Sequence, residues 1–180
     1  RRGSGDEPLQ RARLTSVAAL AGLVRLLADD PVIAAATGGS GRPVAVPDPA
    51  RAVFTAAVAA TGRTPVLVAV PTASEAERLA GDLRQFVGAD AVELFPAWET
   101  LPFERVSPGG ETMGRRLRVL WRLRTGGEHR PAVVVAPIRA LVQRLGPHEE
   151  DLEPVVVRRG ERLDRDELLA ACGTRRLPVA

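Results

Sequence analysis

Residues 66–77 read Val66-Leu67-Val68-Ala69-Val70-Pro71-Thr72-Ala73-Ser74-Glu75-Ala76-Glu77, and they decide the fold class. The five apolar residues before the proline are mostly β-branched, which favours a strand buried on both faces. Pro71 lacks an amide donor and therefore ends the strand. Thr72 and Ser74 each precede a glutamate by three residues, which is the capping-box spacing at the start of a helix. The stretch predicts a buried strand that leads directly into a helix.

The same order of strand, proline and helix recurs along the chain. Short apolar runs end in proline at Val44-Ala45-Val46-Pro47, Val92-Glu93-Leu94-Phe95-Pro96 and Val133-Val134-Val135-Ala136-Pro137. Apolar residues at helical spacing predict helices over residues 14–27, 76–87 and 113–122. Strands that alternate with helices typically form parallel sheets. The sequence therefore predicts an α/β fold in which helices flank a parallel sheet and cover both of its faces.

The sequence divides into three parts. A leading helix and a glycine-rich connector, Thr37-Gly38-Gly39-Ser40-Gly41-Arg42, are expected within residues 1–42. The main α/β domain is expected over residues 43–148. Residues 149–180 contain a short apolar run, Val155-Val156-Val157, and a helix-capping aspartate, Asp164. Because about 30 residues cannot bury a core of their own, we expect this third part to be the opening of a small α+β domain, and the chain to be a piece of a longer protein.

Composition argues against several classes of function. All 25 basic residues are arginines, and 22 carboxylates reduce the net charge to +3, so composition alone does not indicate nucleic-acid binding. No stretch has the roughly 20 apolar residues of a membrane span, and we expect a cytoplasmic protein without membrane contact. Cys172 is the single cysteine, and it stands far from His129 and His148, which excludes a zinc-binding pattern. No catalytic motif is present either, so neither a catalytic nor a metal-binding residue is predicted.

A parallel α/β sheet raises the question of a phosphate-binding loop. Such a loop exposes glycine amides to phosphate and uses a lysine, and this chain contains no lysine. The glycines of residues 37–42 precede a predicted strand rather than follow one. The loop in the correct place, Pro47-Asp48-Pro49-Ala50-Arg51, has two prolines without amide donors and an aspartate where a phosphate would sit. We expect a degenerate nucleotide site that binds no cofactor.

The arginines of residues 115–124 allow two interpretations. Helical spacing gathers several of them on one surface, where Arg118 and Arg122 are candidates for contacting the phosphates of a nucleic acid. The same spacing suits a solvated helix face whose arginines pair with nearby glutamates. The sequence leaves both interpretations open and favours the second.

Residues 94–108 carry a family resemblance. They read Leu94-Phe95-Pro96-Ala97-Trp98-Glu99-Thr100-Leu101-Pro102-Phe103-Glu104-Arg105-Val106-Ser107-Pro108. This stretch resembles the Trp-Glu-Thr-Leu-Pro segment, followed by Ser-Pro, near the start of bacterial transcription-repair coupling factors. Further similarity follows in the same order at Arg115-Arg116-Leu117, at Val133 to Pro137 ahead of a helix with Leu141 and Gln143, and at Arg159-Gly160-Glu161-Arg162-Leu163.

The resemblance implies both a fold and a role. Members of this family begin with a module similar to the excision-repair protein UvrB, in which a helicase-like α/β domain without working nucleotide motifs is interrupted by an inserted domain that binds UvrA. This chain would then be a non-catalytic docking and regulatory module. The resemblance implies that other modules bind RNA polymerase and DNA and carry the ATP- and Mg-dependent translocase that displaces stalled polymerase. No UvrA-binding residue is carried over, because that segment of the family lies beyond Cys172.

The segment around Trp98 supplies the candidate surface residues. Closely spaced prolines among apolar anchors exclude a regular helix or a central strand, so we expect an irregular loop. Its apolar side chains suit support of the sheet edge, and its exposed side suits contact with a partner protein. The candidate partner-surface residues are Trp98, Glu99, Thr100, Leu101, Pro102, Ser107, Pro108, Arg115 and Arg116.

Two other functions compete with the docking role. An active P-loop ATPase or helicase domain is opposed by the missing lysine. A small-molecule-binding, doubly wound α/β domain would hold its ligand in the crevice at the carboxyl ends of the strands. The prolines that follow the predicted strands are expected to block that crevice.

Overall fold

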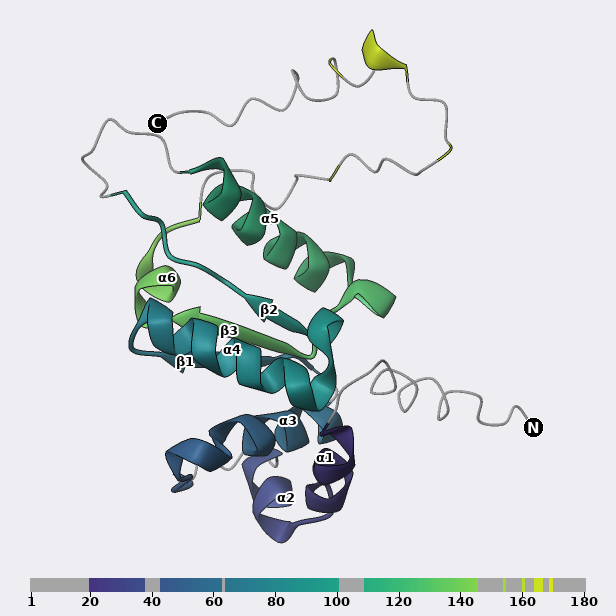
Figure 1. Cartoon of the computed structure of the whole chain (residues 1–180), viewed down its shortest axis with the longest axis vertical. Coiled ribbons are helices and arrows are strands. Elements are labelled where there is room, and N and C mark those ends of the chain that lie inside the picture. The colour runs from purple at the N-terminus through teal and green to yellow at the C-terminus, as the bar shows by residue number, and fades with distance from the viewer. Residues whose placement is uncertain are drawn as a thin grey trace.

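The computed structural model describes residues 20–37, 43–62, 64–100 and 109–145, together with Pro154, Gly160, residues 164–166 and Leu169. It has an α/β fold with an open sheet of three parallel strands, β1 (Val66–Val70), β2 (Val92–Leu94) and β3 (Val133–Pro137), in the order β1-β3-β2 (Figure 1). Val66 and Val92 both lie opposite Val133. The prediction of a parallel sheet among helices is confirmed.

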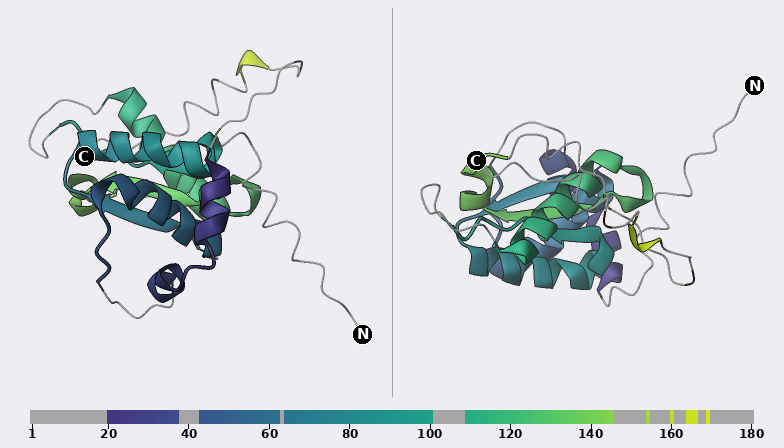
Figure 2. Two further views of the ribbon diagram at one scale, coloured as in Figure 1. Left: turned by 60° about the horizontal axis from the view of Figure 1, so that its bottom comes forward. Right: turned by 90° about the horizontal axis from the view of Figure 1, so that it is seen from above.

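Two helices connect the strands across opposite faces of the sheet. The connection from β1 to β2 contains α4 (Ala73–Val87), and the connection from β2 back to β3 contains α5 (Gly110–Thr125). The two connections run in opposite directions along the sheet, so right-handed crossovers place their helices on opposite faces. Figures 1 and 2 show the resulting layers, with α5 on one side of the strands and α3 and α4 on the other.

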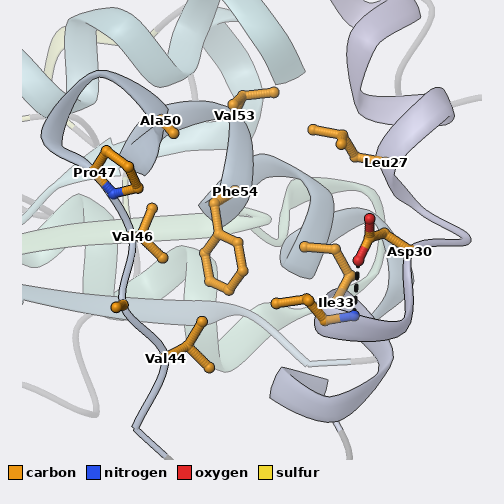
Figure 3. A pocket seen from close by; sticks show the side chains of 11 residues that line it. Leu27, Asp30, Ile33, Val44, Val46, Pro47, Ala50, Val53 and Phe54 are labelled. Carbon is orange, nitrogen blue, oxygen red and sulfur yellow. Dashed lines mark hydrogen bonds between the residues drawn. The ribbon is translucent and has the colours of Figure 1, made fainter.

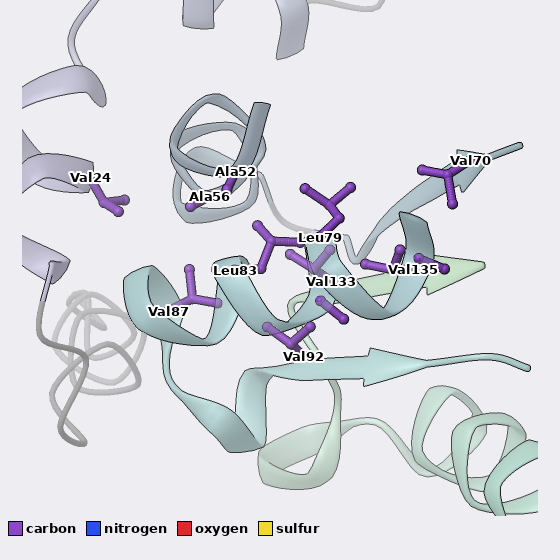
Figure 4. Close-up of a cluster of buried hydrophobic side chains, with 12 residues drawn as sticks. Val24, Ala52, Ala56, Val70, Leu79, Leu83, Val87, Val92, Val133 and Val135 are labelled. Atoms are coloured by element: carbon purple, nitrogen blue, oxygen red, sulfur yellow. The ribbon is translucent and has the colours of Figure 1, made fainter. Parts of the chain in front are cut away.

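Each face of the sheet has its own hydrophobic core. On the α4 face, Leu79 and Leu83 pack with strand valines that include Val133 and Val135 (Figure 4). On the α5 face, Val119 packs with Val134 and with Phe95, which follows β2. The buried positions predicted for α4 are confirmed at Ala76, Leu79, Leu83 and Val87.

Three further helices extend the α4 face. They are α1 (Ala21–Leu27), α2 (Pro31–Thr37) and α3 (Arg51–Thr61), the last preceded by the 3-10 helix η2 (Asp48–Ala50). Val24 of α1 belongs to the same core as α4, and the Leu20 amide donates to the Gln85 carbonyl at 3.0 Å. The predicted leading helix is confirmed over α1, and its earlier residues, 14–19, lie outside the described residues. The sequence did not predict α2.

The segment Val44-Ala45-Val46 was expected to be a strand, and this expectation is wrong. The segment belongs to no strand, and the sheet of the described residues has three strands instead of four. Pro43 and Pro47 bracket the segment and remove an amide donor at each end, which leaves only three residues able to pair. Coverage of both faces is also incomplete at β1, where Leu67 is 59% exposed.

The remaining elements are short. They are the 3-10 helices η3 (Ala89–Ala91) and η4 (Gly127–His129), and the helix α6 (Ile138–Val142) after β3. Gly88 and Gly126 follow α4 and α5 with φ of 91° and 65°, a region that favours glycine. The predicted strand at residues 155–157 lies outside the described residues. Within the described ranges, every helix is too short or too polar to traverse a bilayer.

Of the two candidate caps of α4, Thr72 and Ser74, Thr72 is the one that caps the helix. The Glu75 amide donates to Thr72 Oγ1 at 3.2 Å, and the helix begins at Ala73. The Glu75 side chain accepts from Arg51 instead of closing the box. Ser74, the other candidate cap, lies exposed inside the first turn.

We predict that Thr72→Ala lowers the free energy of unfolding by about 1 kcal/mol, because the Glu75 amide loses its acceptor. Urea denaturation followed by circular dichroism measures this change. Ser74→Ala is the matched control and should change stability by less than about 0.5 kcal/mol. Equal losses in the two variants would show that Thr72 does not cap the helix.

Candidate functional site

A cavity of about 270 Å³ lies at the carboxyl ends of the strands. Its walls come from the first turns of α4, from the segment that follows β2, from the start of α5, and from the junction of β3 with α6. We call this cavity the carboxyl-edge pocket; its charged lining residues are Glu77, Glu99, Arg115 and Arg139, and its aromatic lining residue is Trp98. Pro96 and Pro137 line the cavity as well. The prolines were expected to block this crevice, and that expectation is wrong, because they form part of its wall.

Trp98 is held in the pocket wall by two independent contacts. Its amide donates to Gln143 Oε1 at 2.7 Å, and its carbonyl accepts from Gln143 Nε2 at 3.4 Å. The guanidinium of Arg116 lies 4.5 Å from the Trp98 ring centroid and 4.1 Å from that of Phe95, so the arginine is stacked between the two rings. Residues 95–100 are irregular, as predicted, and Gln143 and Arg116 hold this segment in place; the rest of the predicted loop, residues 101–108, lies outside the described residues.

Arg116 is the innermost of the family-motif residues. It is fully buried, and its NH1 group donates to the Pro96 carbonyl at 2.7 Å. Predicted as a surface candidate, Arg116 lies in the interior instead, because α5 turns this position toward the segment that follows β2. Its guanidinium contacts the Phe95 and Trp98 rings from inside the fold.

Glu99 follows Trp98 and also lines the pocket. Glu99 Oε1 accepts from Thr112 Oγ1 at 2.7 Å, which ties the motif to the first turn of α5. A Cβ at Gly109 would lie only 3.0 Å from Glu99 Oε2, so the glycine permits this close approach. Thr100 is half-buried, and four predicted candidates, Leu101, Pro102, Ser107 and Pro108, lie outside the described residues.

The other predicted arginines of α5 differ in their surroundings. Arg115 lines the pocket and forms an exposed ion pair with Glu111 at 2.5 Å. Arg122 is buried and donates to Glu93 Oε1 at 2.5 Å, and to the carbonyls of His129 and Asp90 at 2.6 Å each. Arg118 reaches the same Glu93 oxygen at 2.9 Å with a 62% exposed side chain.

These contacts agree with the interpretation in which the α5 arginines pair with glutamates. Arg122 would have to leave Glu93 and two carbonyl groups to contact a phosphate, which its burial opposes. A nucleic-acid contact by Arg118 stays a prediction. Glu93 was read only as a strand residue, although a charged residue in an otherwise apolar strand was a signal for a buried ion pair.

The predicted degenerate nucleotide loop forms the entry to α3. Asp48, Pro49 and Ala50 make the 3-10 helix, and the amides of Ala50 and Arg51 already donate to the carbonyls of Pro47 and Asp48. The Arg51 guanidinium is shared between Asp48 at 3.1 Å and Glu75 at 2.7 Å. The amides of Ala50 and Arg51 are therefore already bonded within the loop, and the charged groups beside them include two carboxylates.

A second cavity, of about 240 Å³, lies between α2, residues 44–47 and the start of α3. Figure 3 shows Phe54 and Ile33 among its apolar lining, with Val44 and Val46 along one side. The Val32 amide donates to Asp30 Oδ1 at 2.8 Å at the start of α2. Residues 44–46, which were predicted to form the first strand, lie beside α2 and α3 instead of joining the sheet.

The described residues contain no group of three or more metal-ligating side chains. His129 is exposed, and its ring lies 5.5 Å from that of Trp121. Cys172 and His148 lie outside the described ranges.

Comparison with known proteins gives one consistent result. The chain is 37% identical over 158 residues to transcription-repair-coupling factors of Mycobacterium bovis and Mycobacterium tuberculosis, and the match covers 84% of the chain. It is 32% identical over 118 residues, or 65% of the chain, to the transcription-repair-coupling factor of Escherichia coli. The chain is homologous to one part of the transcription-repair-coupling factors.

The chain spans 13% of the length of its mycobacterial relatives and 10% of the length of the Escherichia coli relative. No protein-family model matches the chain. The resemblance to transcription-repair-coupling factors that the sequence motifs carry is confirmed by these matches. Three residues quoted for that resemblance, Trp98, Arg116 and Gln143, lie together beside the carboxyl-edge pocket.

We predict that Arg122→Ala lowers the free energy of unfolding by about 3 kcal/mol, because it breaks a buried ion pair and leaves two carbonyl groups without their donor. The loss lies at the low end of the range for such pairs, since Arg118 still contacts Glu93. Arg118→Ala is the matched control and should cost less than about 1 kcal/mol. Urea denaturation of both variants compares them, and a loss in the control as large as in Arg122→Ala would contradict this assignment.

Proposed function

We propose that this chain is a non-catalytic docking and regulatory module of a transcription-repair-coupling factor. The complete protein would displace stalled RNA polymerase from damaged DNA with ATP and Mg in another module, and would recruit UvrA. The support is the similarity over 84% of the chain to proteins named transcription-repair-coupling factor.

The observation that carries the non-catalytic role is the environment of Arg51. A phosphate cradle needs open backbone amides and a mobile cation. Here the Ala50 and Arg51 amides are bonded internally, and the Arg51 guanidinium is paired with Asp48 and Glu75. Two carboxylates beside the helix start would repel a nucleotide phosphate. We therefore infer a UvrB-like domain whose P-loop is degenerate.

The docking part of the proposal concerns UvrA. We infer that residues 149–180 open an inserted domain of the UvrA-binding kind, and that residues 43–148 form the helicase-like domain that carries it. The Asp166 amide donates to Asp164 Oδ1 at 2.8 Å, which supports a helix start at the predicted cap. RNA polymerase and DNA are partners of other modules in this proposal.

An active ATPase is the first competing function, and the absence of lysine and the loop geometry both oppose it. The second is a ligand-binding α/β domain. One observation favours a ligand site of some kind: the carboxyl-edge pocket lies where doubly wound sheets bind their ligands.

We predict that Mg·ATP gives no saturable heat of binding with this chain in isothermal titration calorimetry, even at millimolar nucleotide. The Asp48→Asn variant should behave in the same way, because it removes one charge but leaves the prolines and the bonded amides in place. The complete coupling factor serves as the positive control. Stoichiometric ATP binding by this chain would overturn the non-catalytic assignment.

We predict that removing this module from the complete factor leaves its DNA-stimulated ATP hydrolysis at least as fast as before, because no catalytic group is lost. Capture of purified UvrA by the truncated factor should disappear, because the inserted domain loses residues 149–180, which open it in this proposal. Phosphate release and surface plasmon resonance measure the two effects. Loss of ATP hydrolysis together with retained UvrA binding would contradict both halves of the proposal.

A further inference from the structure

The carboxyl-edge pocket is large enough for a few side chains but small for a whole ligand molecule. Its volume of about 270 Å³ lies below the roughly 300–1,000 Å³ of pockets that enclose small molecules. It lies at the point where connections to opposite faces of the sheet diverge, because α4 leaves β1 toward one face and α5 leaves β2 toward the other. Such crevices are the usual ligand positions in open parallel sheets.

Arginine charge remains available at this pocket. Arg139 is exposed, lines the cavity, and makes no ion pair with any described residue. Among the residues that the structure describes, Arg115 pairs only with Glu111, an exposed partner one helical turn away, and such a pair contributes about 0.5 kcal/mol or less. A carboxylate from another molecule can therefore bind Arg139 without first breaking a strong internal contact.

The acidic residues limit which molecules the pocket accepts. Glu77 and Glu99 line the cavity, and Glu111 stands beside Arg115. Three carboxylates against two arginines would repel a polyphosphate backbone, so the charge distribution disfavours nucleic acid. A protein segment with a single carboxylate can pair with Arg139 and meets less repulsion from these carboxylates than a chain of phosphates does.

Trp98 supplies a rigid apolar surface for such a segment. Gln143 holds its backbone on both sides, and the stacked Arg116 holds its ring. Tryptophan and arginine are the residues most enriched in the centres of protein interfaces, and a preordered side chain loses little entropy on binding.

We infer that the carboxyl-edge pocket docks a short segment of a partner protein, in which an apolar side chain rests against Trp98 and a neighbouring carboxylate pairs with Arg139. This inference deepens the proposed docking role and rests on it. It needs neither the inserted domain nor the degenerate nucleotide loop, and it places a second contact surface on the α/β domain itself.

The test uses the full 180-residue chain with Trp121→Phe, which leaves Trp98 as the single tryptophan. A random peptide library displayed on phage is selected against this protein, and the enriched peptides are synthesised. We expect them to share an aspartate or glutamate next to a large apolar residue and to change the Trp98 emission on binding. Arg139→Glu should weaken their affinity at least about tenfold.

Arg130→Glu is the matched control. It makes the same charge change on an exposed arginine that precedes β3, at the amino end of the strands and away from the pocket. This variant should retain affinity within about twofold, since screened surface charges act weakly over such separations.

Several results would overturn the inference. Enriched peptides that leave the Trp98 emission unchanged, or that bind Arg139→Glu as tightly as Arg130→Glu, would place their site elsewhere. A single-stranded oligonucleotide whose binding depends on Arg139 would assign the pocket to nucleic acid. A further variant replaces residues 101–108 by a glycine-serine linker. If peptides bind this variant but not the unchanged chain, the chain itself fills the site. ATP binding would contradict the degenerate loop and leave the peptide result untouched, so the two failures are distinguishable.

Discussion

The position of β3 is the constraint on which the described structure depends. This strand comes last in sequence and lies between the other two, so β1 and β2 have no contact with each other in the sheet. The Val66 amide donates to the Ala132 carbonyl at 2.9 Å, and the Ala132 amide donates to the Ala91 carbonyl at 2.8 Å. Insertion of β3 therefore joins both edges at once, and it forces the helices of the two connections onto opposite faces. The pocket at the carboxyl ends of the strands lies where these two connections leave the sheet toward opposite faces.

Two buried arginines on α5 complete this arrangement. Arg122 ties the helix to β2 and to η3 through Glu93 and Asp90, and Arg116 ties it to the segment that follows β2 through two aromatic rings and the Pro96 carbonyl. A guanidinium suits both positions because it is planar, stacks on rings and donates in several directions. A lysine at either position could not reproduce these contacts, because its ammonium group is a compact charge that does not stack on rings.

Several features could be predicted from sequence, and the reasons for success and failure are physical. The strand at Val66 and the helix after Thr72 combine β-branched residues, a proline and a cap, so local signals agreed and the structure followed them. The segment Val44–Val46 had the same local pattern but formed no strand. Whether a segment pairs with a neighbouring strand depends on tertiary structure, which no local signal encodes. Trp98 was identified as a motif residue, whereas Gln143, 45 residues away, gave no sign that it would hold the Trp98 backbone. Arg116 and Arg122 differ from exposed arginines only in which way the helix turns them.

The exposed face of β1 has a consequence for the chain in solution. Val66–Val70 is an outer strand of the described sheet, and its Leu67 is 59% exposed. Among the described residues β1 pairs with β3 alone, and an outer strand of this kind is a template on which a second molecule can add a strand. Charged residues on outer strands oppose such additions, and β1 has none, since its five residues are all apolar.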